Sequence, residues 1–116
     1  MHPSTIIVTG SSIASLNVAY TVTPPTTIPS GFSEVCINND WDPPQTWGKL
    51  NEGREWYGAK NGAYVYLNGA DGMWWMDTPD GLGKFVARFG GEGNVPTDGW
   101  RPLPGVEGGT PKVAFA

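Results

Sequence analysis

Short runs of alternating, β-branched or aromatic residues, separated by turn residues, recur along the chain. Alternation with a period of two is typical of strands whose two faces differ. The first two runs cover residues 4–9 and 17–23, and Gly10-Ser11-Ser12 between them are turn residues. No window keeps apolar residues at the i, i+3, i+4 and i+7 positions of an amphipathic helix. The pattern therefore predicts strands joined by turns, and no helix longer than a turn or two.

From Glu52 onward the strand-like runs become aromatic and the turns between them become regular. Asn-Gly and Asp-Gly pairs at 61–62, 68–69, 71–72 and 80–81 favour tight turns, because these residues tolerate positive φ angles. We expect an antiparallel meander here, and we expect the last run to close the sheet. The runs are 54–57, 63–67, 73–77, 84–89 and 112–115.

Two proline-rich insertions interrupt the pattern, at about 24–30 and 38–48. Three prolines in the first cannot donate sheet hydrogen bonds and favour an extended loop. The second is rich in turn residues, and residues 32–37 between the two predict a short strand. We therefore expect one domain over residues 1–116. Its predicted fold class is all-β, a small antiparallel barrel or sandwich of about seven or eight short strands with little or no helix.

The two central runs carry large side chains on both faces. Because neighbouring residues of a strand point to opposite sides, one face of a core strand is left with aromatic side chains that a second layer or a ligand must cover. At most one residue of an adjacent tryptophan pair can then anchor the main core. One face of 63–67 carries Tyr64 and Tyr66, and the other Ala63, Val65 and Leu67; in 73–77, Trp74 and Met76 oppose Met73, Trp75 and Asp77.

Composition supports a folded chain and makes several partners improbable. With 116 residues, six tryptophans and 12% aromatic residues, the chain is long enough and apolar enough for one core despite 17 glycines and 11 prolines. Seven scattered basic residues and a net charge of −4 disfavour nucleic acid, which needs clustered Lys and Arg. The N-terminus lacks a basic signal region, and no run approaches the roughly 18 apolar residues of a membrane span. We expect no membrane insertion, and the compartment and oligomeric state stay open.

The inventory of reactive side chains is small. Cys36 is the only cysteine and His2 the only histidine, which excludes disulfide frameworks and Cys/His zinc sites and leaves no ordered histidine to activate a nucleophile. Cys36 lies in an apolar run and is expected to be a buried small hydrophobe, and His2 is expected to be silent. We predict no enzyme, no catalytic residue and no cofactor.

Acidic and glycine-rich segments offer weaker alternatives. Asp71, Asp77 and Asp80, with Asn68 nearby, supply oxygen ligands of the kind calcium takes, but their spacing fits no EF-hand loop. A glycosidase pair drawn from Glu55 and these carboxylates has no supporting pattern. The glycine-rich segments 81–84 and 90–93 lack phosphate-loop spacing and are expected to be turns. No metal site is predicted.

Four segments together resemble a small Trp/Gly-rich β module that recurs in algal, protist and phage-associated proteins without an assigned reaction. The resemblance covers about residues 6–113, and departs from the module at Val18, where glycine is usual, and in the longer insert between Thr23 and Gly48. It implies a repeatable β interaction module. The matching segments are Val8-Thr9-Gly10, Asn17-Val18-Ala19-Tyr20, Gly72-Met73-Trp74-Trp75 and Pro96-Thr97-Asp98-Gly99-Trp100.

A non-catalytic binding module is the leading hypothesis, recognising carbohydrate through an aromatic surface. Indole rings stack on the apolar faces of sugars while polar neighbours bond the hydroxyls. The alternative is a protein interaction or assembly module, because exposed aromatics are also interface hot spots. Trp41 and Trp47 are the first candidates, since their loop is expected to be exposed. The full set of candidate ligand-binding residues is Trp41, Trp47, Trp56, Tyr64, Tyr66, Trp74, Trp75 and Asp77.

Overall fold

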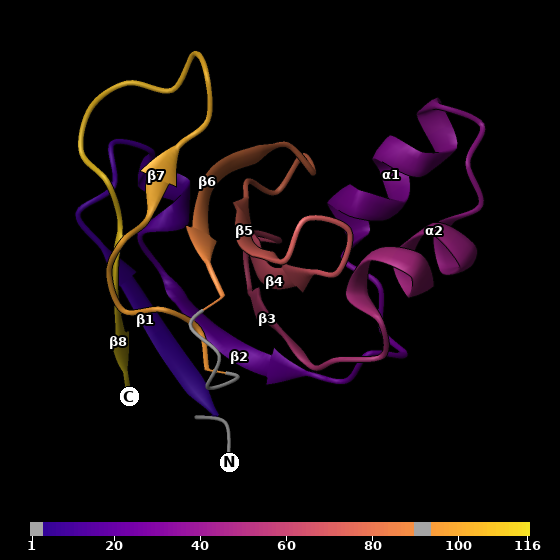
Figure 1. Ribbon diagram of the computed structural model, residues 1–116, viewed down its shortest axis with the longest axis horizontal. Helices are drawn as coiled ribbons and strands as arrows, with labels where there is room; N and C mark the ends of the chain where they lie inside the picture. Colours follow the sequence, from indigo (N-terminus) through magenta and orange to yellow (C-terminus); the bar gives the residue numbers. More distant parts are fainter. Residues whose placement is uncertain (1–3, 90–93) are drawn as a thin grey trace.

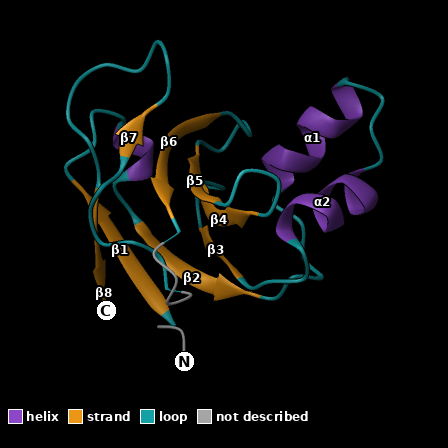
Figure 2. Cartoon of the chain, viewed as in Figure 1, coloured by secondary structure: helices purple, strands orange, loops and turns teal. Residues whose placement is uncertain are grey.

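A computed structural model of the chain describes residues 4–89 and 94–116. Within these residues an eight-stranded antiparallel sheet curls into a half-barrel, and two helices pack on its outer side (Figures 1 and 2). A single 3₁₀ turn, η1, lies between the first two strands. The elements are β1 (Thr5–Thr9), η1 (Ala14–Leu16), β2 (Ala19–Thr23), α1 (Ser30–Asn38), α2 (Pro43–Asn51), β3 (Trp56–Ala59), β4 (Tyr64–Asn68), β5 (Met73–Asp77), β6 (Gly83–Arg88), β7 (Arg101–Pro102) and β8 (Lys112–Phe115).

The strands follow one another as a meander, in the order β7-β6-β5-β4-β3-β2-β1-β8. The predicted antiparallel sheet is confirmed, and so is the prediction that the last run closes it: β8 pairs with β1, with Ile6 opposite Phe115 and Val8 opposite Val113. Gly62 and Gly72 have φ angles of 97° and 70°, as the tight turns at these positions require. The segment 94–100, which leads into β7, contacts β8 at the other edge of the sheet, where the Val113 N–H donates to the Thr97 carbonyl at 2.9 Å.

Two helices stand where the sequence predicted a strand and part of a loop. Residues 32–37 belong to α1, because Phe32 and Cys36 lie one helical turn apart and both bury against the sheet, although Val35 and Ile37 are β-branched. Helix α2 begins inside the second proline-rich insertion: the Asp42 side chain accepts the Gln45 N–H at 3.1 Å, and prolines fill the first helical positions. Each helix has nine residues, longer than the turn or two expected.

Buried side chains form two clusters, one on each face of the sheet. The inner cluster fills the half-barrel, and the outer cluster lies between the sheet and the helices. A second layer of protein therefore covers the aromatic outer face, which the sequence had left to either a layer or a ligand. Principal members of the inner cluster are Ile6, Val8, Leu16, Tyr20, Tyr57, Val65, Trp74, Met76, Phe85 and Trp100; the outer cluster comprises Phe32, Cys36, Trp47, Trp56, Tyr64 and Tyr66.

Candidate functional site

Four of the candidate binding residues form a packed aromatic cluster beneath the helices: Trp47, Trp56, Tyr64 and Tyr66, each no more than 5% exposed. The Trp47 ring lies 5.7 Å from that of Trp56 and 5.2 Å from that of Tyr66, and Phe32 packs edge-on against it at 4.9 Å. The prediction that Trp47 is exposed is wrong, because its segment is a helix that turns the indole towards the sheet. These rings stabilise the joint between helices and sheet, and their faces are not accessible to a ligand.

The first proline-rich loop binds the polar edges of this cluster. The Trp56 indole N–H donates to the carbonyls of Pro24 and Thr27 at 3.1 and 2.9 Å, and the Trp47 indole N–H donates to the Pro25 carbonyl at 3.3 Å. Prolines cannot donate to a sheet, but their carbonyls accept freely. Trp47 and Trp56, which the sequence predicted to be ligand contacts, therefore hold this loop in place through hydrogen bonds.

The adjacent tryptophans of β5 point to opposite faces, as predicted. Trp74 is 3% exposed and lies in the inner cluster, whereas Trp75 is half-buried beside the outer cluster. The Trp75 indole N–H donates to the Asp71 carboxylate at 2.8 Å. Trp75 thus retains a partly accessible edge, and Trp74 is a core residue.

Asp77 is a buried carboxyl group at the end of β5, 4% exposed and paired in the sheet with Tyr64. Burial raises the pKa of Asp77 to about 7; the neighbouring Tyr64 hydroxyl lowers this pKa, and the Asp80 carboxylate raises it. Tyr64 Oη and Asp77 Oδ1 both lack a well-formed hydrogen bond. Burial and the Asp77 charge raise the pKa of the Tyr64 hydroxyl well above its ordinary value. Tyr64 and Asp77 are thus two buried side chains, each with a polar atom that lacks a well-formed hydrogen bond, inside an aromatic layer.

Asp71 and Asp80, which lie before and after β5, are engaged in local hydrogen bonds. Asp71 accepts the Met73 N–H at 2.9 Å, while Asp80 accepts the Thr78 hydroxyl and the Leu82 N–H. The Thr78 hydrogen bond is the largest influence that lowers the pKa of Asp80. Over residues 4–89 and 94–116, no three His, Cys, Asp or Glu side chains gather in a way that could hold a metal ion.

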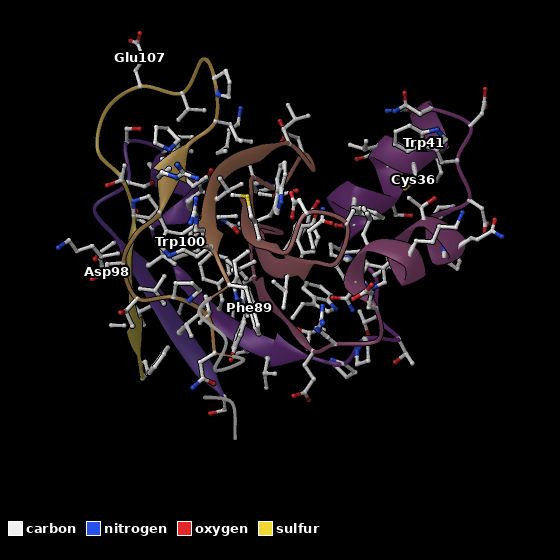
Figure 3. The ribbon with its side chains drawn as sticks, in the orientation of Figure 1. Cys36, Trp41, Phe89, Asp98, Trp100 and Glu107 are labelled. Atoms are coloured by element: carbon white, nitrogen blue, oxygen red, sulfur yellow. The ribbon has the colours of Figure 1, made fainter. Side chains whose placement is uncertain are left out.

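Trp41 differs from the other candidates because it is 53% exposed. It stands in the connection between α1 and α2, at the outer end of the helical pair (Figure 3). The expected exposure of Trp41 is confirmed. Cys36, labelled beside it, is buried as expected, and burial raises the pKa of its thiol.

Hydrogen bonds on both sides hold the Trp41 backbone. Its N–H donates to the Cys36 carbonyl at 2.8 Å, and the Asp40 N–H donates to the Ile37 carbonyl at 3.2 Å. With Asp40 in the left-handed region, at φ 58°, this is a Schellman ending for α1. The next residue, Asp42, caps α2. The indole is therefore presented from a preorganised turn.

Polar and apolar residues flank Trp41 in the chain. Asn38, Asn39, Asp40 and Asp42 are all exposed. Ile37, at the end of α1, is 61% exposed. The turn thus offers a flat apolar ring, amide and carboxylate groups, and one aliphatic side chain.

The chain matches no protein-family model, no curated protein and no solved structure. None of the helices in the described part of the chain is long and apolar enough to cross a membrane. His2 and the glycine-rich segment 90–93, both predicted to be without a binding role, lie outside the described residues.

Sequence reasoning missed a hollow of about 650 Å³ where β6 and β7 approach β8. Its lining includes Arg88, Arg101, Asp98 and Phe115. The pairing of β6 with β7 places Arg88 near Arg101, and β8, at the other end of the sheet, adds Phe115; the lining residues share no sequence motif. The one sequence signal is that two of the three arginines lie in the last third of the chain.

Proposed function

We propose that the chain is a non-catalytic binding module that recognises carbohydrate through the exposed indole of Trp41. The observation that carries the proposal is the preorganised turn: Trp41 is 53% exposed, its N–H is bonded to the end of α1, and the next residue caps the start of α2. A backbone already held in place loses little conformational entropy when a ligand stacks on the side chain that it presents. The Trp/Gly-rich β module that the sequence resembles is a binding unit of the same general kind, and membership of it is part of the proposal.

The neighbours of Trp41 favour a sugar over a purely apolar ligand. An indole offers an apolar face for the C–H face of a pyranose, and amides and carboxylates nearby bond its hydroxyls. Asn38 and Asp40 are exposed in the same turn and can serve in this way. One aromatic contact and a few exposed hydrogen bonds predict weak binding per site.

A protein partner is the second candidate, and the exposure of Ile37 favours it. Ile37 is 61% exposed, and its segment leads directly into the Trp41 turn. Tryptophan beside aliphatic surface is typical of interface hot spots. Such a module would dock on another chain or on copies of itself.

The test is calorimetric titration of the chain with a panel of soluble neutral oligosaccharides. We expect one sugar class to bind saturably, and Trp41→Ala to weaken that binding roughly tenfold or more through loss of stacking. Phe89→Ala is the matched control, because Phe89 is 43% exposed and lies away from the helical pair (Figure 3). Its affinity should stay within about twofold of the unaltered chain.

Thermal unfolding of each variant separates lost binding from lost fold. No binding to any sugar would overturn the carbohydrate proposal. If light scattering then showed concentration-dependent association that Ile37→Ala and Trp41→Ala both reduce, the protein-interaction candidate would replace it. Equal sugar affinity in Trp41→Ala and the unaltered chain would remove Trp41 from the site.

A further inference from the structure

We propose that the hollow between β6, β7 and β8 is a second binding site, which takes a sugar ring bearing a carboxylate, as in the uronate units of acidic polysaccharides. The hollow measures about 650 Å³, within the usual range of small-ligand pockets. It lies apart from Trp41: Figure 3 shows Asp98, which lines it, on the side of β1 and β8, opposite the helical pair. The inference does not rest on the proposed role of Trp41.

Arg88 and Arg101 supply the positive charge of the hollow. Arg101 of β7 pairs with Val86 of β6, so Arg88, two residues further along β6, lies diagonally across on the same face of the sheet. Diagonal neighbours of this kind have Cα atoms roughly 7–8 Å apart, within reach of two long side chains. Both arginines are exposed. Two guanidinium groups can therefore meet one carboxylate, whose two oxygens match their forked donors.

The two arginines of the hollow stand out because the chain as a whole is acidic. Eleven acidic residues outnumber seven basic ones, yet two of the three arginines share this hollow. Among the residues that the structure describes, the ion pair within 4.0 Å joins Arg54 to Glu52, and neither Arg88 nor Arg101 has a carboxylate partner. A ligand carboxylate would supply one.

The rest of the lining suits a hydroxylated ring. Asn94, Thr97 and Asp98 offer amide, hydroxyl and carboxylate groups for ring hydroxyls. Phe115 is 47% exposed and provides an apolar wall on the β8 side. The described lining carries two guanidinium groups and one carboxylate, that of Asp98, which suits a ring with a single carboxylate better than a phosphate dianion.

Calorimetric titration with trigalacturonate, and with its methyl ester, tests the site. We expect the acid to bind and the neutral ester to bind at least tenfold more weakly, because only the acid pairs with the guanidinium groups. Arg88→Gln and Arg101→Gln should each weaken binding of the acid about tenfold. Arg54→Gln is the matched control, an arginine outside the hollow, and should leave the affinity within about twofold.

The same titrations decide between this site and its competitors. Equal binding of acid and ester, or unchanged affinity in both arginine variants, would overturn the proposal. Tighter binding of inorganic phosphate or of an acidic peptide than of trigalacturonate would also overturn it and name a different ligand class. Trp41→Ala should leave trigalacturonate binding intact, so that failure here and failure of the neutral-sugar site are separate results.

Discussion

At the scale of single residues, Asp77 is a carboxyl group that the fold holds in an apolar place. It is 4% exposed, and burial raises its pKa to about 7 from an ordinary value of 3.8. The folded chain therefore keeps the Asp77 proton over a pH range in which the unfolded chain releases it. Below about pH 4 the carboxyl group is neutral in both states, and its ionisation does not lower the free energy of unfolding. Between about pH 4 and 7 the folded state loses stability as pH rises, and above pH 7 the cost is constant.

Asp77→Asn tests this sign, because the amide resembles the neutral acid and does not ionise. Raising the pKa of Asp77 from 3.8 to about 7 lowers the free energy of unfolding by about 4 kcal/mol once the carboxyl is ionised in both states. We expect the variant to gain up to that amount in unfolding free energy, relative to the unaltered chain, between pH 4 and pH 8. Denaturant unfolding at the two pH values measures it, with Asp40→Asn as the control for loss of one negative charge. If Asp77→Asn changes the free energy of unfolding by the same amount at both pH values, the prediction is contradicted.

The exposure of Trp41 and Trp47 also depends on the fold around them. Trp41 and Trp47 stand six positions apart in a segment that reads as a loop, yet one is 53% exposed and the other 3%. Their accessibility depends on helix α2, which starts at Pro43, between them. The capping signals of that helix, Asp42 and the two prolines that follow it, are present in the sequence. Its burial of Trp47 depends on the outer face of the sheet and is not a local property.

At the scale of elements, the contact between α1 and the β5–β6 turn is close enough to require glycine. A Cβ added to Gly31 would meet the Pro79 carbonyl and lie 2.7 Å from the Gly81 backbone nitrogen. Both of these neighbours are backbone atoms, which cannot rotate aside. Helix α1 therefore rests on the turn through Gly31, and this contact positions the cover of the aromatic cluster.

Gly31→Ala should destabilise the chain by about 1–3 kcal/mol, because the helix must move off the turn. Gly48→Ala is the matched control in α2: a Cβ there meets nothing within 4 Å, and removing a helical glycine should stabilise by about 0.5–1 kcal/mol. Denaturant unfolding of both variants checks the opposite signs. The same sign for both would show that the close contact at Gly31 does not control stability.

At the scale of the whole molecule, β8 completes the sheet by covering the edge of β1. Its residues from Lys112 to Phe115 pair with Thr9 to Ile6, and Val113 is buried in the inner cluster. An uncovered strand edge presents free N–H and carbonyl groups that pair with other chains. The C-terminal strand therefore protects β1 as well as adding to the core.

A chain ending at Pro111 should lose stability and associate in a concentration-dependent way, because the β1 edge is then open. Light scattering over a range of concentrations, together with thermal unfolding, measures both effects. A chain lacking only Ala116 is the control, since it keeps all four pairs between β8 and β1. A shortened chain that stays monomeric and equally stable would show that β8 is dispensable.

Most of the strands were readable from local patterns, whereas the burial or exposure of the aromatic side chains was not. Residues 73–77 were predicted as a strand and form β5 with the same bounds, because alternation and flanking turn residues act within a few positions. Residues 32–37 were misread as a strand: a nine-residue helix gives too short a pattern to outweigh the β-branched Val35 and Ile37. Which aromatic faces meet solvent depended on where α1 and α2 pack, and the placement of Arg88 diagonal to Arg101 depended on the pairing of β6 with the two-residue strand β7. Both arise from contacts between separate elements, and such contacts leave no periodic trace in a single sequence.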